Sequence, residues 1–281
     1  MWTRVRRQRR LQLFVALAMV LTLAAACGTP QQAQEASTSQ IDSILKAGVL
    51  KVGLDIFVPW AFKDKDGNLV GFEVDVANKL AQDMGVQVEF VPTEWSGIIP
   101  ALLTGKFDVI IGGMGVTTER ALKVNFSDPY EWGGIDVVVN KTMLPDVTSD
   151  LSALNSEDVV IAVRLGATPV EAAKKVAPKA QLHQFDTDEA VLQDVLNGNA
   201  HAAFSSSPTP AFWAADYPDT LYRPLADSDL LSKQPSAFAV RKGDPDTLAF
   251  FNSWILINQD WLQERADYWY GTRDWAPLLG E

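Results

Sequence analysis

The segment GGMGVTTER at residues 112–120 holds residue types that bind a small anion. Glycines let backbone amides approach a ligand closely, and a guanidinium matches a carboxylate with two hydrogen bonds. No Gly-Lys-Ser or Gly-Lys-Thr follows the glycines, so a nucleotide phosphate loop is disfavoured. The alternative is a surface ion pair between Arg120 and Glu119. The candidate binding residues of this segment are Gly112, Gly113, Gly115, Thr117 and Arg120.

A second turn has a similar character. Residues 166–168, Gly-Ala-Thr, stand between an apolar run and a helical pattern. The free N–H groups and the dipole at the start of a helix favour an anion, so this turn is a second candidate for carboxylate binding. Thr168 could equally be a plain N-cap that needs no ligand. Arg164, two residues before the turn, adds a second guanidinium.

Charge and composition limit the partners. The 281 residues include 24 Lys plus Arg against 35 Asp plus Glu, a net charge of −11. Five of the arginines lie in the first ten residues, so removal of residues 1–26 leaves 19 basic and 35 acidic groups, or −16. Such a surface repels phosphate backbones, and no nucleic-acid partner is expected. One cysteine excludes an intrachain disulfide, and His183 and His201 stand far apart, so we expect no metal site and no cofactor.

Residues 1–26 have the organisation of an export signal peptide: a basic start, an apolar run too short to span a bilayer, and small residues before Cys27. Small residues before a cysteine resemble a bacterial lipobox, in which the thiol receives a diacylglycerol. We therefore predict lipidation of Cys27, with ordinary cleavage between small residues as the alternative. Residues 27–40, rich in Gln, Ser and Thr, would form a flexible, lipid-anchored tether. The protein would be exported and held at the periplasmic or cell-surface face of a membrane.

Apolar runs alternate with helical patterns in the rest of the chain, which predicts two consecutive α/β units. Apolar strands at 135–141 and 235–242 would cross between the units, which gives lobe 1 as residues 41–138 and 235–281 and lobe 2 as residues 139–234. The predicted strands of the units are 49–55, 86–92, 108–113, 158–167, 180–185 and 201–206, and the predicted helices are 72–85, 96–107, 168–176 and 187–197. A last helix is expected over 245–263, with Trp254, Trp261 and Tyr268 on one face.

Three segments, residues 53–81, 95–130 and more loosely 163–168, resemble the bacterial extracellular solute-binding proteins of ABC importers, in particular the polar amino-acid class. The resemblance extends over nearly all of residues 42–275. It implies an α/β, two-lobed periplasmic-binding-protein-like fold of type II, with lobes joined by two crossing strands. A small ligand, an amino acid or related carboxylate, would be captured as the lobes close and delivered to an ABC transporter permease. A monomer is expected.

The resemblance also assigns roles to the two turns. Family members use the arginine at the position of Arg120 for the α-carboxylate of the ligand, with the residue at Thr117 and nearby backbone groups assisting. Thr168 occupies the corresponding position of the second lobe. It would therefore complete carboxylate binding from the opposite side of the cleft.

Aromatic side chains are expected to form the walls of the cleft. By alignment, Phe57 falls where the family stacks a ring on the ligand, Trp95 lies on the opposite wall, and Trp60 is close by. Each of these rings could instead belong to the core. Asp55 stands where members with cationic ligands place an acid, and a solvated loop carboxylate is the alternative.

One position departs from the family pattern. In α-amino-acid binders an aspartate after the last strand of the second lobe accepts hydrogen bonds from the ligand ammonium, and Ser206 stands there. A serine brings no charge. Arg164 stands where some relatives reach the ligand side chain, so two arginines and one missing acid tilt the predicted cleft toward anions. The candidates are a dicarboxylate, an amino-acid derivative without a free ammonium, or an ordinary polar amino acid if Asp55, Glu94 or Glu131 supplies the carboxylate.

Two other functions remain open on the same fold. The chain resembles a cyclohexadienyl dehydratase across its first lobe and again weakly near its end, and fold alone does not separate a binder from a catalyst. Such an enzyme carries a general acid shortly after the Gly-x-Thr turn, where Glu171 follows Thr168 by three residues. A ligand-sensing module is the third possibility. The prediction is a binding protein and not an enzyme.

Overall fold

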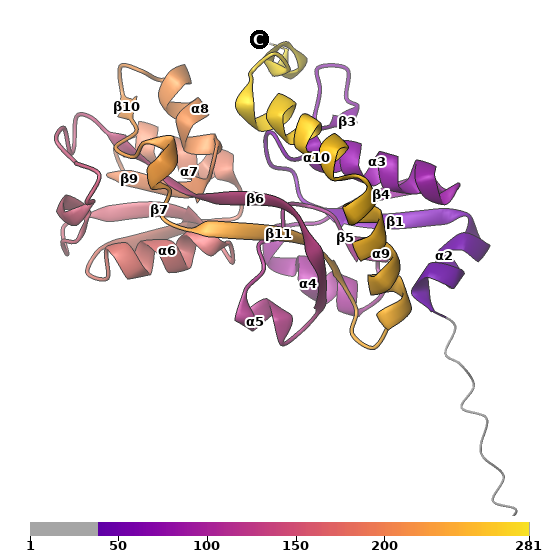
Figure 1. Ribbon diagram of the computed structural model, residues 1–281. Coiled ribbons are helices and arrows are strands. Elements are labelled where there is room, and N and C mark those ends of the chain that lie inside the picture. The colour runs from indigo at the N-terminus through magenta and orange to yellow at the C-terminus, as the bar shows by residue number, and fades with distance from the viewer. Residues whose placement is uncertain (1–38, 281) are drawn as a thin grey trace, which may run out of the picture. The chain divides into compact units, whose positions relative to one another are not determined.

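The computed structural model describes residues 39–280, in which helices and strands alternate as the sequence predicts (Figure 1). The fold is the expected α/β, type II arrangement. The strands are β1 Val49–Leu54, β2 Phe62–Lys63, β3 Leu69–Val70, β4 Gln87–Pro92, β5 Val109–Ile110, β6 Asn125–Asn140, β7 Val160–Arg164, β8 Gln181–Phe185, β9 Ala202–Ser206, β10 Leu221–Tyr222 and β11 Lys233–Val240. The α-helices are α2 Gln40–Ala47, α3 Phe72–Met84, α4 Ile98–Leu103, α5 Thr118–Ala121, α6 Thr168–Val176, α7 Asp188–Leu196, α8 Thr209–Asp216, α9 Pro245–Ile257 and α10 Gln259–Ala266.

The first lobe is built on the strand order β4-β1-β5-β11-β6. β1 pairs in parallel with β4 and with β5, whereas β11 runs antiparallel to β5. One core cluster collects buried side chains of α2, α3, α9 and the chain end, and a second collects those of α4 and β5. Parallel strands covered on both faces explain why β1 and β5 consist almost entirely of apolar residues. The carboxyl ends of β1 and β5 therefore meet at one edge, where ligand-binding turns are expected.

The second lobe continues the same sheet with the order β6-β9-β7-β8. β9 and β8 run parallel to β7, and β10 pairs with the end of β6. One core cluster includes buried residues of α6 and the other includes those of α7 and α8. The start of α6 and the start of α7 thus lie at the carboxyl ends of neighbouring strands.

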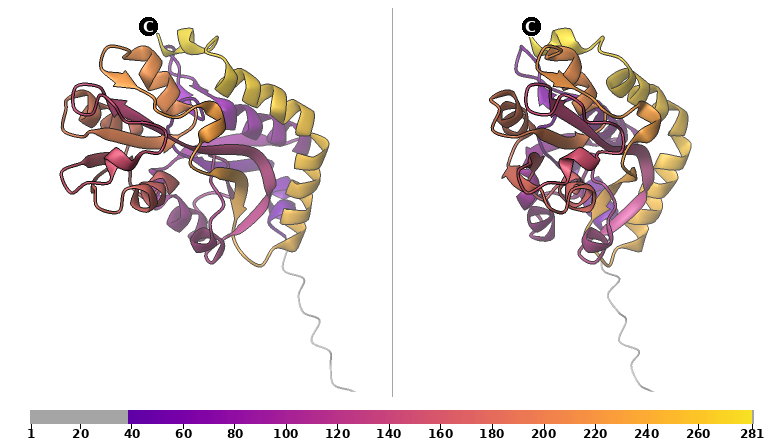
Figure 2. Two further views of the ribbon diagram at one scale, coloured as in Figure 1. Left: turned by 60° about the vertical axis from the view of Figure 1, so that its left-hand side comes forward. Right: turned by 90° about the vertical axis from the view of Figure 1, so that its left-hand side faces the viewer.

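Two strands carry the chain across both lobes and lie side by side (Figure 2). β6 pairs with β11 from Asn125 to Gly134 and with β9 from Ile135 to Val139. The change of partner therefore falls between Gly134 and Ile135, four residues before the predicted lobe boundary at 139. The sequence pattern did not reveal this because the apolar run of β6 covers only 135–139, whereas its first-lobe part includes polar residues such as Asp128 and Glu131.

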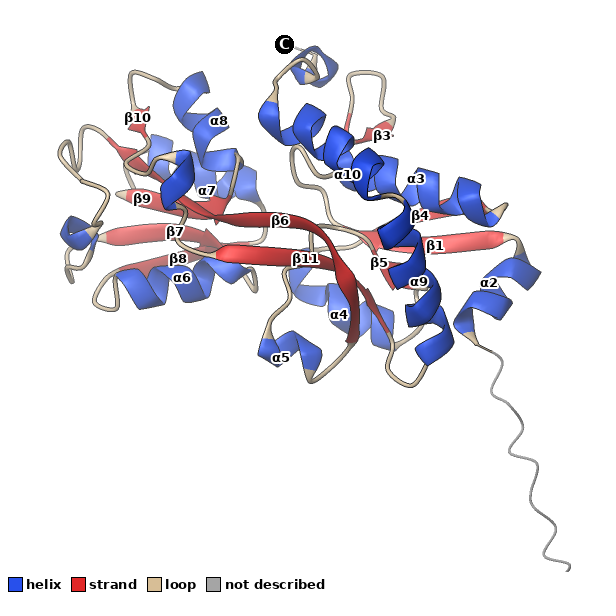
Figure 3. Cartoon of the chain, in the orientation of Figure 1, coloured by secondary structure: helices blue, strands red, loops and turns tan. Residues whose placement is uncertain are grey.

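The predicted helix over 245–263 is two helices, α9 and α10, which meet at Asn258 (Figure 3). The Asn258 side-chain amide donates to the Trp254 carbonyl at 2.9 Å and so competes with the backbone ladder that would continue the helix. The single helical face predicted for the three rings is therefore wrong. All three still pack on one core, since Trp254 is buried in it and Trp261 and Tyr268 lie against it.

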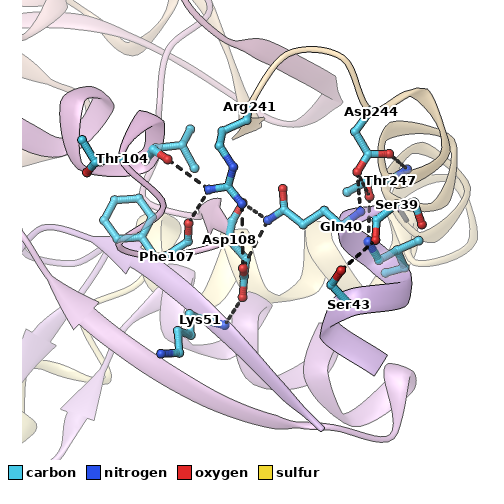
Figure 4. Close-up of polar contacts among 12 residues, drawn as sticks. Ser39, Gln40, Ser43, Lys51, Thr104, Phe107, Asp108, Arg241, Asp244 and Thr247 are labelled. Atoms are coloured by element: carbon cyan, nitrogen blue, oxygen red, sulfur yellow. Dashed lines mark hydrogen bonds and ion pairs between the residues drawn. The ribbon is translucent and has the colours of Figure 1, made fainter. Parts of the chain in front are cut away.

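The described part of the chain begins at Ser39, slightly before the predicted end of the tether at residue 40. Ser39 caps α2, and the Gln40 N–H donates to Asp244 at 2.6 Å, while the Gln40 side chain donates to the Asp108 carbonyl at 2.6 Å (Figure 4). Asp244 also accepts from the Thr247 N–H at the start of α9. These contacts fix the first helix to β5 and α9. The predicted signal peptide, Cys27 and most of the tether lie outside the described residues.

Within residues 39–280 no helix combines the length and the apolar character that crossing a bilayer requires.

Candidate ligand-binding site

A cavity lies between the lobes at the carboxyl ends of the strands. Residues from both lobes and from both crossing strands line it, and they include eleven of the twelve binding residues predicted within the folded body together with several that sequence reasoning missed. The predicted ones are Asp55, Phe57, Trp60, Trp95, Gly112, Gly113, Gly115, Arg120, Arg164, Thr168 and Ser206.

Arg120 enters the cavity from the short helix α5 and is 9% exposed. Its Nη1 donates to the Gly115 carbonyl at 2.8 Å, and its Nη2 donates to the Gly166 carbonyl of the other lobe at 3.1 Å. The guanidinium lies 5.4 Å from the centroid of the Trp95 ring. Burial lowers the pKa of Arg120 to about 10, so the side chain stays cationic at neutral pH. Among residues 39–280 it forms no ion pair, and the predicted alternative of a salt bridge with Glu119 is absent there.

Thr117 does not line the cavity. Its side-chain oxygen accepts a hydrogen bond from the Arg120 N–H at 3.2 Å, which makes it the N-cap of α5. An N-cap satisfies an otherwise unpaired donor at the start of a helix. The threonine therefore orients the turn that carries Arg120, and the direct ligand contact expected of it has no support in its position.

Gly113 has a left-handed backbone, with φ +63°, and lies under the ring of Trp60. A Cβ atom there would be 2.7 Å from Trp60 Cδ1, so only glycine fits without moving the ring. The Gly113 N–H donates to the Tyr130 hydroxyl at 3.2 Å. That N–H therefore already has a partner within the protein. The ligand contact predicted for Gly113 cannot come from this N–H.

The crowding at Gly113 leads to a prediction with a matched control. We expect Gly113→Ala to lower the free energy of unfolding by roughly 2–5 kcal/mol, because the left-handed backbone and the displaced indole both cost energy. Gly105 has a similar φ of +77° but open space around its Cα, so Gly105→Ala should lose only about 1–2 kcal/mol. Urea unfolding of both variants measures the difference. Equal losses would contradict a steric role for Trp60.

Two stacked rings form one wall of the cavity. Phe57 and Trp60 lie 4.3 Å apart between centroids with an interplanar angle of 3°. Trp60 is 6% exposed, and its ring centroid lies 5.0 Å from that of Tyr270, which makes it both a core residue and a cavity residue. Trp95 lies beside Arg120. The sequence left core packing and ligand contact as alternatives for these rings. In the structure, Trp60 is packed in the core and also lines the cavity.

Arg164 is held by two carboxylates. Its Nη2 pairs with Asp55 of the first lobe, and its Nη1 lies 3.2 Å from Asp188 at the start of α7. Asp188 also accepts from the Ser205 hydroxyl at 2.8 Å. Burial raises the pKa of Asp188 to about 6, although Arg164 acts to lower it, and burial likewise raises the pKa of Asp55. The sequence analysis counted Arg164 as a second cation available to the ligand and therefore favoured an anionic ligand. That argument is wrong, because Arg164 already pairs with two carboxylates of the protein.

The crossing strands supply Gln234 and Ser236, which sequence reasoning did not place in the site, and Glu131, which it named only as one of three possible acids. The Thr168 hydroxyl donates to the Gln234 side chain of β11 at 2.8 Å, and the N-cap role considered for this threonine is wrong, because the N-cap of α6 is Ala167. Glu131 of β6 lines the cavity beside Ser236 of β11. Burial raises the pKa of Glu131 to about 7, against a hydrogen bond from Ser236 that lowers it. Neither strand carries a local motif, so only the pairing register reveals these residues.

A buried acid lies beneath the glycine turn. Glu73 of α3 is fully buried and accepts from the Tyr130 hydroxyl at 2.8 and 2.7 Å. Burial raises the pKa of Glu73 to about 8. Tyr130 thus joins Glu73 to the Gly113 N–H, and this chain of hydrogen bonds fixes the floor of the cavity.

The sequence profile of the bacterial extracellular solute-binding proteins, family 3, matches residues 50–272, which include both turns, both crossing strands and the cavity between them. The chain belongs to this family. The match covers well over half of the chain and agrees with the resemblance found in the segments around Asp55, Arg120 and Thr168.

Individual members of this solute-binding family are similar along most of the chain. The L-cystine-binding protein TcyJ of Escherichia coli K12 is 29% identical over 234 residues, which cover 82% of this chain and 86% of TcyJ. The crystal structure of the ancestral amino acid-binding protein AncCDT-1, a precursor of cyclohexadienyl dehydratase, has 40% identity and a TM-score of 0.75, and covers 83% of this chain and 99% of that one. A cyclohexadienyl dehydratase of Pseudomonas aeruginosa is 25% identical over 275 residues, covering 95% of this chain and 96% of the enzyme.

Proposed function

We propose that this solute-binding protein captures an amino acid, or a closely related small carboxylate, between its two lobes and delivers it to the permease of an ABC importer. The observation that carries the proposal is Arg120, a buried cation that lines the cavity and forms no ion pair within residues 39–280. A buried charge without a partner is costly, and a ligand carboxylate provides that partner in a bidentate geometry. Both relatives described as binding proteins bind amino acids according to their names.

Capture would work through contacts between the lobes. Arg120 belongs to the first lobe and already reaches the Gly166 carbonyl in the turn before α6. A carboxylate placed against Arg120 would face that turn and the start of α6, where free N–H groups favour an anion. Because such a ligand contacts both lobes, it stabilises the arrangement in which they are together, and the permease would recognise that arrangement.

The N-terminal segment would place the binding protein outside the cytoplasm. Residues 1–26 would direct export and be removed, and Cys27 would receive the lipid that anchors the chain. Residues 28–38 would then leave the folded body free to collect ligand close to the membrane. Mass spectrometry of the membrane-extracted protein tests this proposal, since a diacylglyceryl group on Cys27 is expected and an unmodified thiol would contradict it.

A lyase activity is the second candidate, favoured by the similarity to cyclohexadienyl dehydratase over 95% of the chain. The general acid that the sequence offered, Glu171, does not support it. That side chain is 77% exposed, lies outside the cavity lining and pairs with Lys174 at 2.7 Å. Glu131, with its pKa near 7, is a carboxyl group in the cavity that could donate a proton. Absence of dehydratase turnover with cyclohexadienyl substrates at pH 6 to 8 is the result expected for a binder.

Thermal unfolding with candidate ligands tests the binding function directly. A ligand at one hundred times its Kd stabilises the folded state by about 2.7 kcal/mol, which raises Tm by about 5 to 10 °C for a body of this size. We expect such a shift with at least one of the proteinogenic amino acids, their N-acetyl derivatives or small dicarboxylates. If no member of these three sets raises Tm, the proposed function is wrong.

A further inference from the structure

Three carboxylates line the cavity, and two of them share one cation. Asp55 and Asp188 both pair with Arg164. Glu131 is the remaining one, and among the described residues it forms no ion pair. A half-buried carboxylate without a cation loses part of its hydration, and only a hydrogen bond from Ser236 replaces it. Glu131 therefore mirrors Arg120, the buried cation that also has no oppositely charged partner.

The pairing register relates these two groups in space. Glu131 pairs with Ser236 across β6 and β11, and Ser236 forms a bridge with Gly115, whose carbonyl accepts from Arg120. Neighbouring strands lie about 4.8 Å apart. Because Ser236 lies between Glu131 and Gly115, the backbones of these two residues are about 10 Å apart. Both side chains line the same cavity. A small zwitterion or a longer amino acid can contact both of them at once.

The space around the Glu131 carboxylate is kept open by small residues. A Cβ atom at Gly133 would lie 3.3 Å from Glu131 Oε1, closer than side chains normally tolerate. Gly134, Ser206 and Ser236 line the cavity in the same region. The carboxylate is thus half-buried and approachable by a ligand, which an acid used only for packing does not require.

We infer that Glu131 accepts hydrogen bonds from a cationic nitrogen of the ligand and so supplies the charge that Ser206 lacks. The inference rests on the proposed function and refines it, because it assigns the ligand class: amino acids with a positive nitrogen opposite the carboxylate that Arg120 binds. That nitrogen is either the α-ammonium or a distal cation on the side chain. The α-ammonium and the distal cation lie at different places in the ligand, and the ligands used in the test distinguish between them.

Titration of Glu131 gives the site a pH dependence. A bound cation favours the ionised carboxylate, so affinity should fall as pH falls through the pKa near 7, by at most about tenfold per pH unit. The titratable groups near Glu131 are Glu73 on α3, Tyr130 on β6 and Tyr270 near the chain end, and burial raises the pKa of each. Ionised Glu73 at high pH would strengthen the attraction for a cation.

The test compares Glu131→Gln with Glu171→Gln, the same substitution at an exposed position outside the cavity. Calorimetric titration uses four probes: L-lysine, L-glutamine, Nα-acetyl-L-lysine and glutarate. We expect Glu131→Gln to weaken binding of the cationic probes about 10- to 100-fold, the range for a hydrogen bond to a charged group, while Glu171→Gln leaves it unchanged. The wild-type protein should bind the cationic probes more weakly at pH 6 than at pH 8, and Glu131→Gln should reduce that difference.

The probes identify which nitrogen is bound. Loss confined to L-lysine and L-glutamine indicates the α-ammonium, whereas loss with L-lysine and Nα-acetyl-L-lysine indicates the distal cation. A double variant, Glu131→Gln with Ser206→Asp, should recover affinity in the first case, since Ser206 lines the cavity from the other lobe. Thermal unfolding without ligand checks that each variant is folded.

Some outcomes overturn the inference while leaving the proposed function intact. Wild-type affinity of Glu131→Gln for the cationic probes, or a wild-type protein that binds glutarate alone, would show that Glu131 does not hold a cation. In either case carboxylate capture by Arg120 would remain. If no probe binds and no ligand raises Tm in the thermal unfolding screen, both the proposed function and this inference are wrong.

Discussion

Replacement of Arg120 by alanine is expected to weaken ligand binding severely while leaving the protein folded. The guanidinium is 9% exposed, bonds carbonyls of both lobes and has no carboxylate partner among residues 39–280. Loss of one partner of a buried, hydrogen-bonded charge pair costs about 2–5 kcal/mol, which corresponds to a Kd about 30- to several-thousand-fold higher. Calorimetric titration with the ligand found by thermal unfolding measures the change.

Two further variants sharpen this prediction. Arg120→Lys keeps the charge but not the planar fork, so it should recover only part of the affinity. Arg273→Ala removes an arginine that pairs with Asp216 away from the cavity, and it should bind as the wild type does. Retention of full affinity by Arg120→Ala would place the ligand carboxylate elsewhere.

Replacement of Arg164 by methionine should have the largest effect on stability. The arginine is buried between Asp55 and Asp188, and its removal leaves both carboxylates without a cation. Breaking a buried pair in this way costs about 3–5 kcal/mol. Removing the cation also raises the pKa of both acids further. Because a raised pKa in the folded state makes stability fall as pH rises, the variant should be weakest at pH 8 and recover toward pH 5.

A second substitution separates charge from packing in this cluster. Asparagine at position 188 removes one of the stranded charges while keeping a side chain that can accept from Ser205. We therefore expect the double variant Arg164→Met with Asp188→Asn to be more stable at pH 8 than Arg164→Met alone, as measured by urea unfolding. If the double variant is no more stable, lost packing of the arginine stem and not the uncompensated charge would explain the defect.

Much of the fold could be predicted from local patterns. The helix over 168–176 was predicted with its observed bounds, because a turn glycine and a proline mark its start. The strand pattern around 49–55 was equally clear, since parallel strands buried on both faces are almost wholly apolar. The last helix was predicted as one element because its aromatic spacing continues through Asn258. That break depends on a side-chain hydrogen bond that spacing does not reveal.

The site was predictable where its chemistry lies in one short segment. Arg120 and the glycines before it follow each other within nine residues, so residue types alone indicated an anion site. The partners of Arg164 were not predictable, since Asp55 and Asp188 are far from it in sequence and meet it only through the sheet order. Glu131 was considered only as one of several acids. Its place in the cavity depends on the register between two crossing strands.

The crossing strands β6 and β11 have a mechanical consequence. When two bodies rotate about a common axis, an atom moves in proportion to its distance from that axis. Glu131 and Gln234 lie on the crossing strands themselves, near the point between Gly134 and Ile135 where β6 changes partner. They should shift little when the lobes swing apart, whereas Asp55 and Arg164, on separate lobes, must part. If Glu131 selects the ligand as inferred above, ligand choice depends on a side chain that moves little, whereas the ion pair between Asp55 and Arg164 holds the lobes together.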